Sequence, residues 1–198
     1  NAIRTLRKKG ISLRKTITVP NKEALNEQNP EFPFWVESLD KEIRSLIETG
    51  SLKLVSPADL RRDDEVLPSL VVFTRKRDGR FKARLVACGN FQSILSREVY
   101  SAVAAHEVWL SVLVVGVCEL GWDGCSVDVT TAFLQSEKEF DPKTKRTHVR
   151  FGKKILEVIR RMYPNTPEYA EILKALYGER TAPKAWTATM THYICKTL

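Results

Sequence analysis

The residues best suited to chemistry are an isolated aspartate, a pair of cations and one glycine. Asp128 lies in Ser-Val-Asp-Val, where a short strand is expected to end, so its carboxylate could bind a metal ion or cap a turn. Lys82 and Arg84 are two residues apart on another expected strand and therefore point to one face, where they could bind phosphate or be solvated. Gly178 could admit a ligand close to the backbone or form an ordinary turn. Taken singly, each feature is more typical of a structural role than of a functional one.

The elements that would carry these residues follow from apolar spacing and turn signals. Trp35, Leu39 and Ile43 recur at helical spacing, which predicts a helix that ends at Gly50. An Asp-Gly pair at 78–79 indicates a hairpin. The sequence also predicts a loop at 57–68, strands at 52–55, 70–73, 81–87, 125–129, 148–151 and 172–177, a mostly buried helix at 101–120, and helices that end at 162 and begin near 183.

Charge is distributed unevenly along the chain. The net charge of the 198 residues is +8, and residues 1–22 contribute +7 of it because they contain no acidic residue. We therefore expect residues 1–30 to be a basic arm or linker and residues 31–198 to form the folded domain. Such an arm could neutralise phosphates of a nucleic acid or could be a solvated linker.

Composition excludes several classes of protein. Hydrophobic residues make up 43% and charged residues 28%, which excludes a disordered chain, a collagen-like chain and a disulfide scaffold. The longest apolar run, 108–118, has 11 residues and is too short to span a bilayer, so no membrane partner is expected. The four cysteines form no Cys-x-x-Cys pair and no secretion signal is visible. We expect an intracellular protein, cytoplasmic or nuclear, with reduced cysteines and no zinc site.

Trp35, Glu42 and Leu46 are followed in the sequence by three motifs. They are Lys-Arg-Asp-Gly-Arg-Phe-Lys-Ala-Arg-Leu-Val-Ala-Cys-Gly-Asn-Phe-Gln (76–92), Val-Asp-Val-Thr-Thr-Ala-Phe-Leu (127–134) and Leu-Tyr-Gly-Glu-Arg-Thr-Ala-Pro-Lys-Ala-Trp (176–186). From Trp35 onward the chain resembles the reverse transcriptase, an RNA-directed DNA polymerase, of copia-type retrotransposon polyproteins. The resemblance implies an α+β fold, with the fingers of a right-hand polymerase and a partial ferredoxin-like palm.

The resemblance also implies a metal site. Asp128 matches the first catalytic aspartate, which binds Mg²⁺, and the Val129 carbonyl would add a hard oxygen ligand. In this family two metal ions activate the primer hydroxyl and stabilise the transferring phosphoryl group. The backbone N–H groups of Thr131 and Ala132 would face the triphosphate of the incoming deoxynucleotide.

Further positions match the nucleotide pocket of the family. Phe133 matches the aromatic gate that leaves no room for a 2′-hydroxyl group, and it could equally pack in the core. Tyr177 and Gly178 match the segment that lines the nucleotide and template-base pocket. Lys82 and Arg84 match the finger positions that contact triphosphate and template, and alternation does not decide which of them reaches the phosphate. Two positions depart from the family pattern, namely Glu179 in place of Leu and Thr181 in place of Gln.

The implied partners are an RNA or DNA template–primer, deoxynucleoside triphosphates and other parts of a polyprotein. The family's second acidic motif, an aromatic residue followed by x-Asp-Asp, would come after Trp186, and the sequence to Leu198 does not contain it. We expect the chain alone not to polymerise and to expose an apolar patch. A non-catalytic nucleic-acid-binding relic and a decayed product without function are the alternatives; an Asp-Asp motif further downstream would favour the polymerase, and salt-dependent binding would favour a binder.

Overall fold

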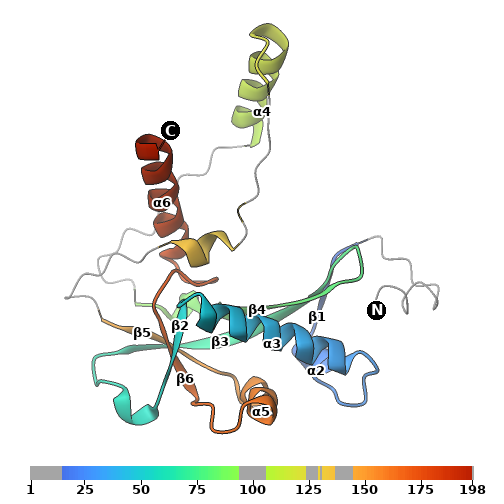
Figure 1. Cartoon of the computed structure of the whole chain (residues 1–198), viewed down its shortest axis with the longest axis vertical. Helices are drawn as coiled ribbons and strands as arrows, with labels where there is room; N and C mark the ends of the chain where they lie inside the picture. The colour runs from blue at the N-terminus through green and yellow to red at the C-terminus, as the bar shows by residue number, and fades with distance from the viewer. Residues whose placement is uncertain (1–14, 94–105, 124–128, 130, 137–144, 198) are drawn as a thin grey trace.

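The chain folds around one six-stranded mixed sheet. The computed structural model describes residues 15–93, 106–123, 129, 131–136 and 145–197 (Figure 1). The strands follow the order β1-β3-β5-β6-β2, with β4 beside β3, and all pairs are antiparallel except β3 with β5. Their bounds are β1 Ile17–Val19, β2 Leu52–Val55, β3 Glu65–Arg75, β4 Phe81–Ala87, β5 Thr147–Arg150 and β6 Tyr169–Ile172. The α+β class expected from the sequence is confirmed.

Strand β3 is the longest strand and connects the two halves of the sheet. Its first residues, 65–68, pair with β5, while residues 69–75 pair with β4. The expected loop at 57–68 is therefore wrong at its end, because pairing with β5 extends the strand back to Glu65. Strand β1 pairs with the last residues of β3, and Ala24 and Leu25 just after it are buried. Residues 17–25, within the range assigned to the basic arm, contribute to the same sheet and core.

The hairpin predicted at Asp78-Gly79 is confirmed, and β4 has the bounds expected from the sequence. The Gly79 N–H donates to the Lys76 carbonyl at 2.9 Å, and the Lys76 N–H donates to the Arg80 carbonyl at 2.8 Å. Gly79 has a φ of 88°, in the left-handed region that glycine adopts without steric penalty. This local turn fixes the register in which β4 returns along β3.

Helix α3 (Phe32–Glu48) lies along the β3–β4 hairpin (Figure 1). Its residues Trp35, Leu39 and Leu46 are fully buried, as helical spacing predicts. The Trp35 ring packs edge-on against Phe73 and Phe81, with centroid distances of 5.6 and 4.5 Å. Aromatic pairs of this geometry add to the free energy of apolar burial, so they fix the helix on the hairpin.

The second half of the fold contains helix α5 (Lys153–Met162), which confirms the helix expected to end at residue 162. The strand predicted at 172–177 is wrong. Strand β6 covers Tyr169–Ile172, and the Leu173 N–H still donates to the Ser51 carbonyl at 2.9 Å as the last bond beside β2. Because β2 begins at Leu52 and β5 at Thr147, antiparallel pairing carries the residues after Leu173 past the start of both neighbours. Residues 173–177 therefore form a loop that crosses towards β4.

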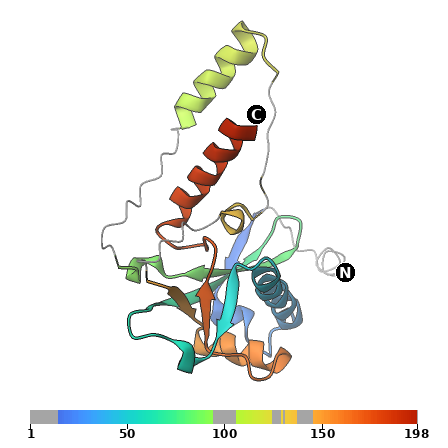
Figure 2. The ribbon, with the colours of Figure 1, turned by 60° about the vertical axis from the view of Figure 1, so that its left-hand side comes forward.

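Helices α4 (His106–Val114) and α6 (Ala182–Thr197) extend away from the sheet (Figure 2). A π-helical turn, Val115–Glu119, continues α4. The buried helix expected in this region is wrong in its burial, because Trp109, Val112 and Val115 are 46–57% exposed. The exposed apolar patch was expected instead from the last helix, where Tyr193 and Ile194 on α6 are 56% and 49% exposed. Among the described residues no helix has the length and apolar character needed to cross a bilayer. The remaining elements are α2 (Asn21–Ala24) and three short 3-10 helices: Pro57–Asp59, Gly89–Phe91 and Ala132–Gln135.

Candidate nucleotide and nucleic-acid interface

Strand β4 lies at an edge of the sheet, and two segments distant in sequence cover that edge. The Leu85 N–H donates to Oε1 of Glu42 on α3 at 3.1 Å. The Ala87 N–H donates to the carbonyl of Tyr177, in the loop after β6, at 2.8 Å. Residues two apart on a strand direct their N–H groups to the same side. The two contacts therefore satisfy neighbouring donors that would otherwise offer a template for pairing with another chain.

The loop after β6 approaches β4 so closely that only glycine fits at two positions. A Cβ atom on Gly178 would lie 2.1 Å from the Ala87 carbonyl oxygen, and one on Gly89 would lie 2.1 Å from the Gly178 carbonyl oxygen. Gly178 also has a φ of 87°. The sequence predicted for Gly178 either an ordinary turn or a close approach to a ligand. In the structure Gly178 lies in a turn, and the backbone that it approaches closely is that of Ala87 in β4.

Next to this contact, the side chains of Arg84, Tyr177 and Phe133 pack together. The Arg84 guanidinium carbon lies 5.5 Å from the centre of the Tyr177 ring, within the range of a cation–π interaction. The Phe133 ring meets Tyr177 edge-on, with centroids 5.6 Å apart and planes inclined by 79°. Three residues that the sequence singled out, from β4, from the segment 131–136 and from the loop after β6, are thus brought together.

The charges around these three side chains influence one another. Burial raises the pKa of Glu42, and the Leu85 N–H and the cations Lys82 and Arg84 oppose that rise. Burial and then the charge of Arg84 lower the pKa of Lys82. Burial raises the pKa of Tyr177, with Arg84 acting in the opposite direction. The Nε atom of Arg84 is buried and has no hydrogen-bond acceptor among the described residues.

Not every predicted site residue can be placed. Asp128, the expected metal ligand, lies outside the described residues. Val129 is half-buried and in no regular element. Thr131 has a left-handed backbone, with φ 54°, and precedes the 3-10 helix that begins at Ala132. Among the described residues no three histidine, cysteine or acidic side chains are grouped so that they could hold a metal ion. Magnesium therefore remains an expectation from the resemblance.

Glu179, which differs from the motif that the sequence resembles, has a structural role. Its side chain is 3% exposed, and its Oε2 atom accepts the Leu176 N–H at 2.8 Å. The Glu179 N–H donates in return to the Leu176 carbonyl at 3.2 Å. The carboxylate thus closes its own turn, and burial of the side chain keeps it from the exposed surface.

Sequence reasoning did not assign roles to Glu42 and Gly89. A signal was available for Glu42, because it is three residues after Leu39 and so shares the apolar face of the helix. An acidic residue on a buried face needs a partner, and here that partner is the edge of β4. Gly89 carried no local signal, since its approach to Gly178 joins segments almost ninety residues apart.

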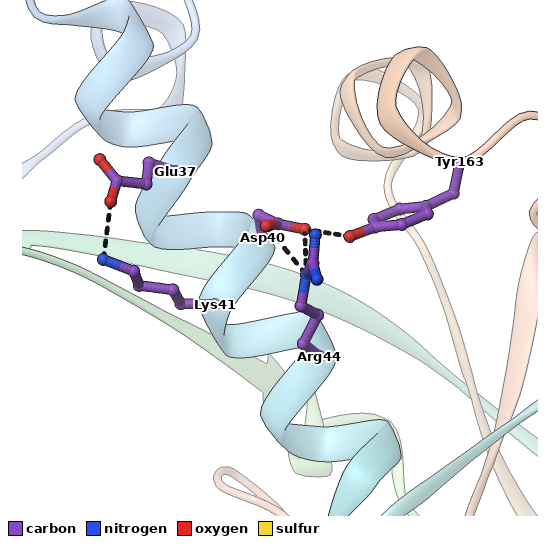
Figure 3. Close-up of polar contacts among 5 residues, drawn as sticks. All are labelled: Glu37, Asp40, Lys41, Arg44 and Tyr163. Atoms are coloured by element: carbon purple, nitrogen blue, oxygen red, sulfur yellow. Dashed lines mark hydrogen bonds and ion pairs between the residues drawn. The ribbon is translucent and has the colours of Figure 1, made fainter.

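A cavity lies away from the edge of β4, between α3 and α5. It has a volume of about 400 Å³ and is lined largely by apolar side chains, including Ile43, Ile47 and Ile159. A polar group stands beside it (Figure 3): Tyr163 donates its hydroxyl to Asp40 at 2.5 Å, and Arg44 donates Nε to the same carboxylate at 3.1 Å. The bond from Tyr163, the residue that follows α5, connects that helix to α3. None of the residues predicted for the site lines this cavity.

Two of these bonds also set the protonation of Asp40. Burial alone would raise the pKa of that carboxyl group, but the bonds from Tyr163 and Arg44 outweigh it and lower the pKa. Figure 3 also shows the exposed pair of Glu37 and Lys41, one turn away on α3, at 2.7 Å. Exposed pairs of this kind contribute little to stability, so the link from Asp40 to Tyr163 is the one that joins the elements.

Comparison with known proteins gives no independent assignment. No protein-family model and no solved structure matches the chain.

Proposed function

We propose that this chain is the fingers and front part of the palm of a copia-type reverse transcriptase, and that it binds a deoxynucleoside triphosphate and a template–primer at the edge of β4. The observation that carries the proposal is the convergence of Arg84, Tyr177 and Phe133 from three separate segments. Each of the three residues matches a nucleotide-binding position of the family that the sequence resembles. Arginine–aromatic contacts also occur elsewhere in this fold, at Arg75 with Phe81 and at Arg44 with Tyr163, so the support comes from the match of all three residues to one motif set.

The arrangement suits a nucleoside triphosphate. Arg84 offers a planar set of donors that matches phosphate oxygens, and its contact with Tyr177 limits its freedom before a ligand arrives. Lys82, on the same face of β4, adds a second positive charge. The rings of Tyr177 and Phe133 provide an apolar surface on which a base or sugar could pack. The proposal concerns binding, and magnesium enters it only through the resemblance.

Titration with dTTP and with a labelled primer–template tests the proposal. Arg84→Ala should weaken dTTP binding by about tenfold or more, because a hydrogen bond to a charged group contributes about 1.5–3 kcal/mol. Arg84→Lys should restore part of the loss, since it keeps the charge but not the planar donors. Arg77→Ala, at the exposed hairpin turn, is the matched control and should leave dTTP binding within about twofold.

Two results would contradict the proposal. One is equal dTTP affinity in the wild type and in Arg84→Ala. The other is a ribonucleotide that binds as well as dTTP in the wild type and gains nothing in Phe133→Ala, which would remove the argument for an aromatic gate.

A non-catalytic nucleic-acid binder is the second candidate. It is favoured by the exposed cations of the hairpin turn, Arg77 and Arg80, beside the single acid Asp78. Such a protein would bind duplex with affinity that falls by about 0.9 decades per decade of salt for each phosphate contacted. It would show no preference for dTTP, and Arg77→Ala would weaken duplex binding more than Arg84→Ala.

A further inference from the structure

Glu42 is an acidic residue in a place where the proposed ligand is an anion. Its carboxylate accepts the Leu85 N–H at 3.1 Å at the edge of β4. It is half-buried, and the charged groups acting on it are Lys82 and Arg84 from the same strand. In the loop after β6, burial and the charge of Glu42 raise the pKa of Tyr177, whose ring contacts Arg84. A negative charge therefore lies within the cluster of cations that would bind phosphate.

We propose that Glu42 is a specificity-determining residue that restrains anion binding at Lys82 and Arg84 while its hydrogen bond to Leu85 holds the edge of β4. The inference rests on the proposed function, because it concerns the same two cations. It assigns two separable roles to one carboxylate, which are to accept a backbone N–H and to carry a negative charge.

Physical reasoning supports both roles. Lys82 and Arg84 point to the same face of β4 with one residue between them, so their charges repel each other, and the Glu42 charge offsets part of this repulsion. An incoming polyphosphate offsets the same repulsion and is itself repelled by Glu42. Bare phosphates should therefore bind weakly, and a ligand that also packs on Tyr177 would have a source of affinity independent of charge.

Glu42→Gln separates the two roles. The glutamine side-chain oxygen can still accept the Leu85 N–H, so the edge is kept, whereas the negative charge is lost. The matched control is Glu37→Gln, which removes an equal charge from the same helix at an exposed position paired with Lys41. Both variants change the net charge of the chain by the same amount, so a difference between them reports position.

The first experiment measures inorganic tripolyphosphate binding by calorimetry at fixed ionic strength. Glu42→Gln should bind it on the order of tenfold more tightly than the wild type, and Glu37→Gln should stay within about twofold of it. Unchanged or weaker binding in Glu42→Gln, with an unchanged melting temperature, would overturn the inference. If Arg84→Ala binds tripolyphosphate as well as the wild type, the proposed phosphate site itself fails; if only Arg84→Ala has an effect, the site stands and the role of Glu42 fails.

A second measurement needs no variant at position 42. Sulfate keeps its charge between about pH 7.5 and pH 4.5. Burial raises the pKa of Glu42 above its ordinary value of 4.5, so this carboxylate takes up a proton within that range. Wild-type sulfate affinity should therefore increase on acidification, and Arg84→Ala should lose that increase. Sulfate affinity independent of pH across this range would overturn the inference even if Glu42→Gln did not fold.

Discussion

The contact between the loop after β6 and strand β4 predicts a graded loss of stability in three glycine variants. Gly50→Ala would place a side chain at a φ of 65° with nothing within 4 Å of the new atom. Gly89→Ala would place a Cβ atom 2.1 Å from the Gly178 carbonyl oxygen. Gly178→Ala combines a φ of 87° with a Cβ atom 2.1 Å from the Ala87 carbonyl oxygen. The three changes therefore separate backbone strain, steric overlap and their sum.

The magnitudes follow from these distances. A left-handed backbone costs a residue with a side chain about 1–2 kcal/mol, which is the expected loss in Gly50→Ala. An overlap with a carbonyl oxygen at 2.1 Å forces the two backbones apart and breaks the bond between the Ala87 N–H and the Tyr177 carbonyl. Leaving such a buried pair unsatisfied costs about 1–3 kcal/mol, the expected loss in Gly89→Ala. Gly178→Ala should then lose about 2–5 kcal/mol.

Urea denaturation followed by tryptophan fluorescence measures these losses. The slope of the free energy of unfolding against urea should stay constant, so a shift of the midpoint reports stability. The Gly89→Ala, Gly178→Ala double variant should be less destabilised than the sum of its single changes, because both disrupt one contact. A Gly89→Ala protein as stable as the wild type would refute the reasoning, since the overlap at that position involves backbone and no side chain can move to relieve it.

Three further outcomes are expected. Trp35→Ala should lower the free energy of unfolding by about 3–5 kcal/mol in guanidinium titrations, because the buried indole packs on two aromatic rings. Trp35→Phe should lower it by less than about 1.5 kcal/mol, because the indole N–H has no acceptor among the described residues and its loss breaks no hydrogen bond there. Burial lowers the pKa of His148 below its usual 6.5, so the stability that the neutral imidazole contributes should be fully present above pH 6.5 and fall as the pH drops towards the lowered pKa. Thermal melts across that range measure this fall in melting temperature, and His148→Gln should not show it. Burial would raise the pKa of Asp64, but hydrogen bonds from Arg146 and the Arg61 N–H outweigh it and lower this pKa below 3.8. The stability that the ionised carboxylate contributes should be present above pH 3.8 and be lost as the pH falls through the lowered pKa, and acid titrations of Asp64→Asn should not show this loss.

Local patterns predicted the elements that local interactions determine. The bounds of β4 follow from alternation and from the Asp-Gly turn, and the buried face of α3 follows from helical spacing. The strand expected at 172–177 was wrong because β6 can pair only as far as its antiparallel neighbours extend, and β2 begins at Leu52, in a segment distant in sequence. Apolar content predicted burial for the helix before Leu120, but burial depends on what packs against a helix, and several of its apolar side chains are exposed among the described residues.

In the candidate site, too, local patterns predicted the positions of residues on a strand, and contacts between distant segments were not predictable. Alternation correctly placed Lys82 and Arg84 on one strand with a common direction. It could not show that Tyr177 stacks on Arg84 or that Phe133 packs on Tyr177, because these contacts depend on the path of the loop after β6. The motif resemblance selected the participants, and the tertiary structure supplied their geometry.

The edge of β4 joins stability to the proposed function. The backbone bond from Ala87 to Tyr177 protects an edge strand and also holds the ring on which Arg84 stacks. A change at Gly178 should therefore weaken dTTP binding together with folding, because it moves Tyr177 away from β4. Glu42→Gln should change anion binding while folding stays intact, because the edge bond to Leu85 persists without the charge. If Gly178→Ala destabilised the chain yet left dTTP affinity unchanged, the edge contact would be structural only, and Arg84 would have to be positioned by something other than Tyr177.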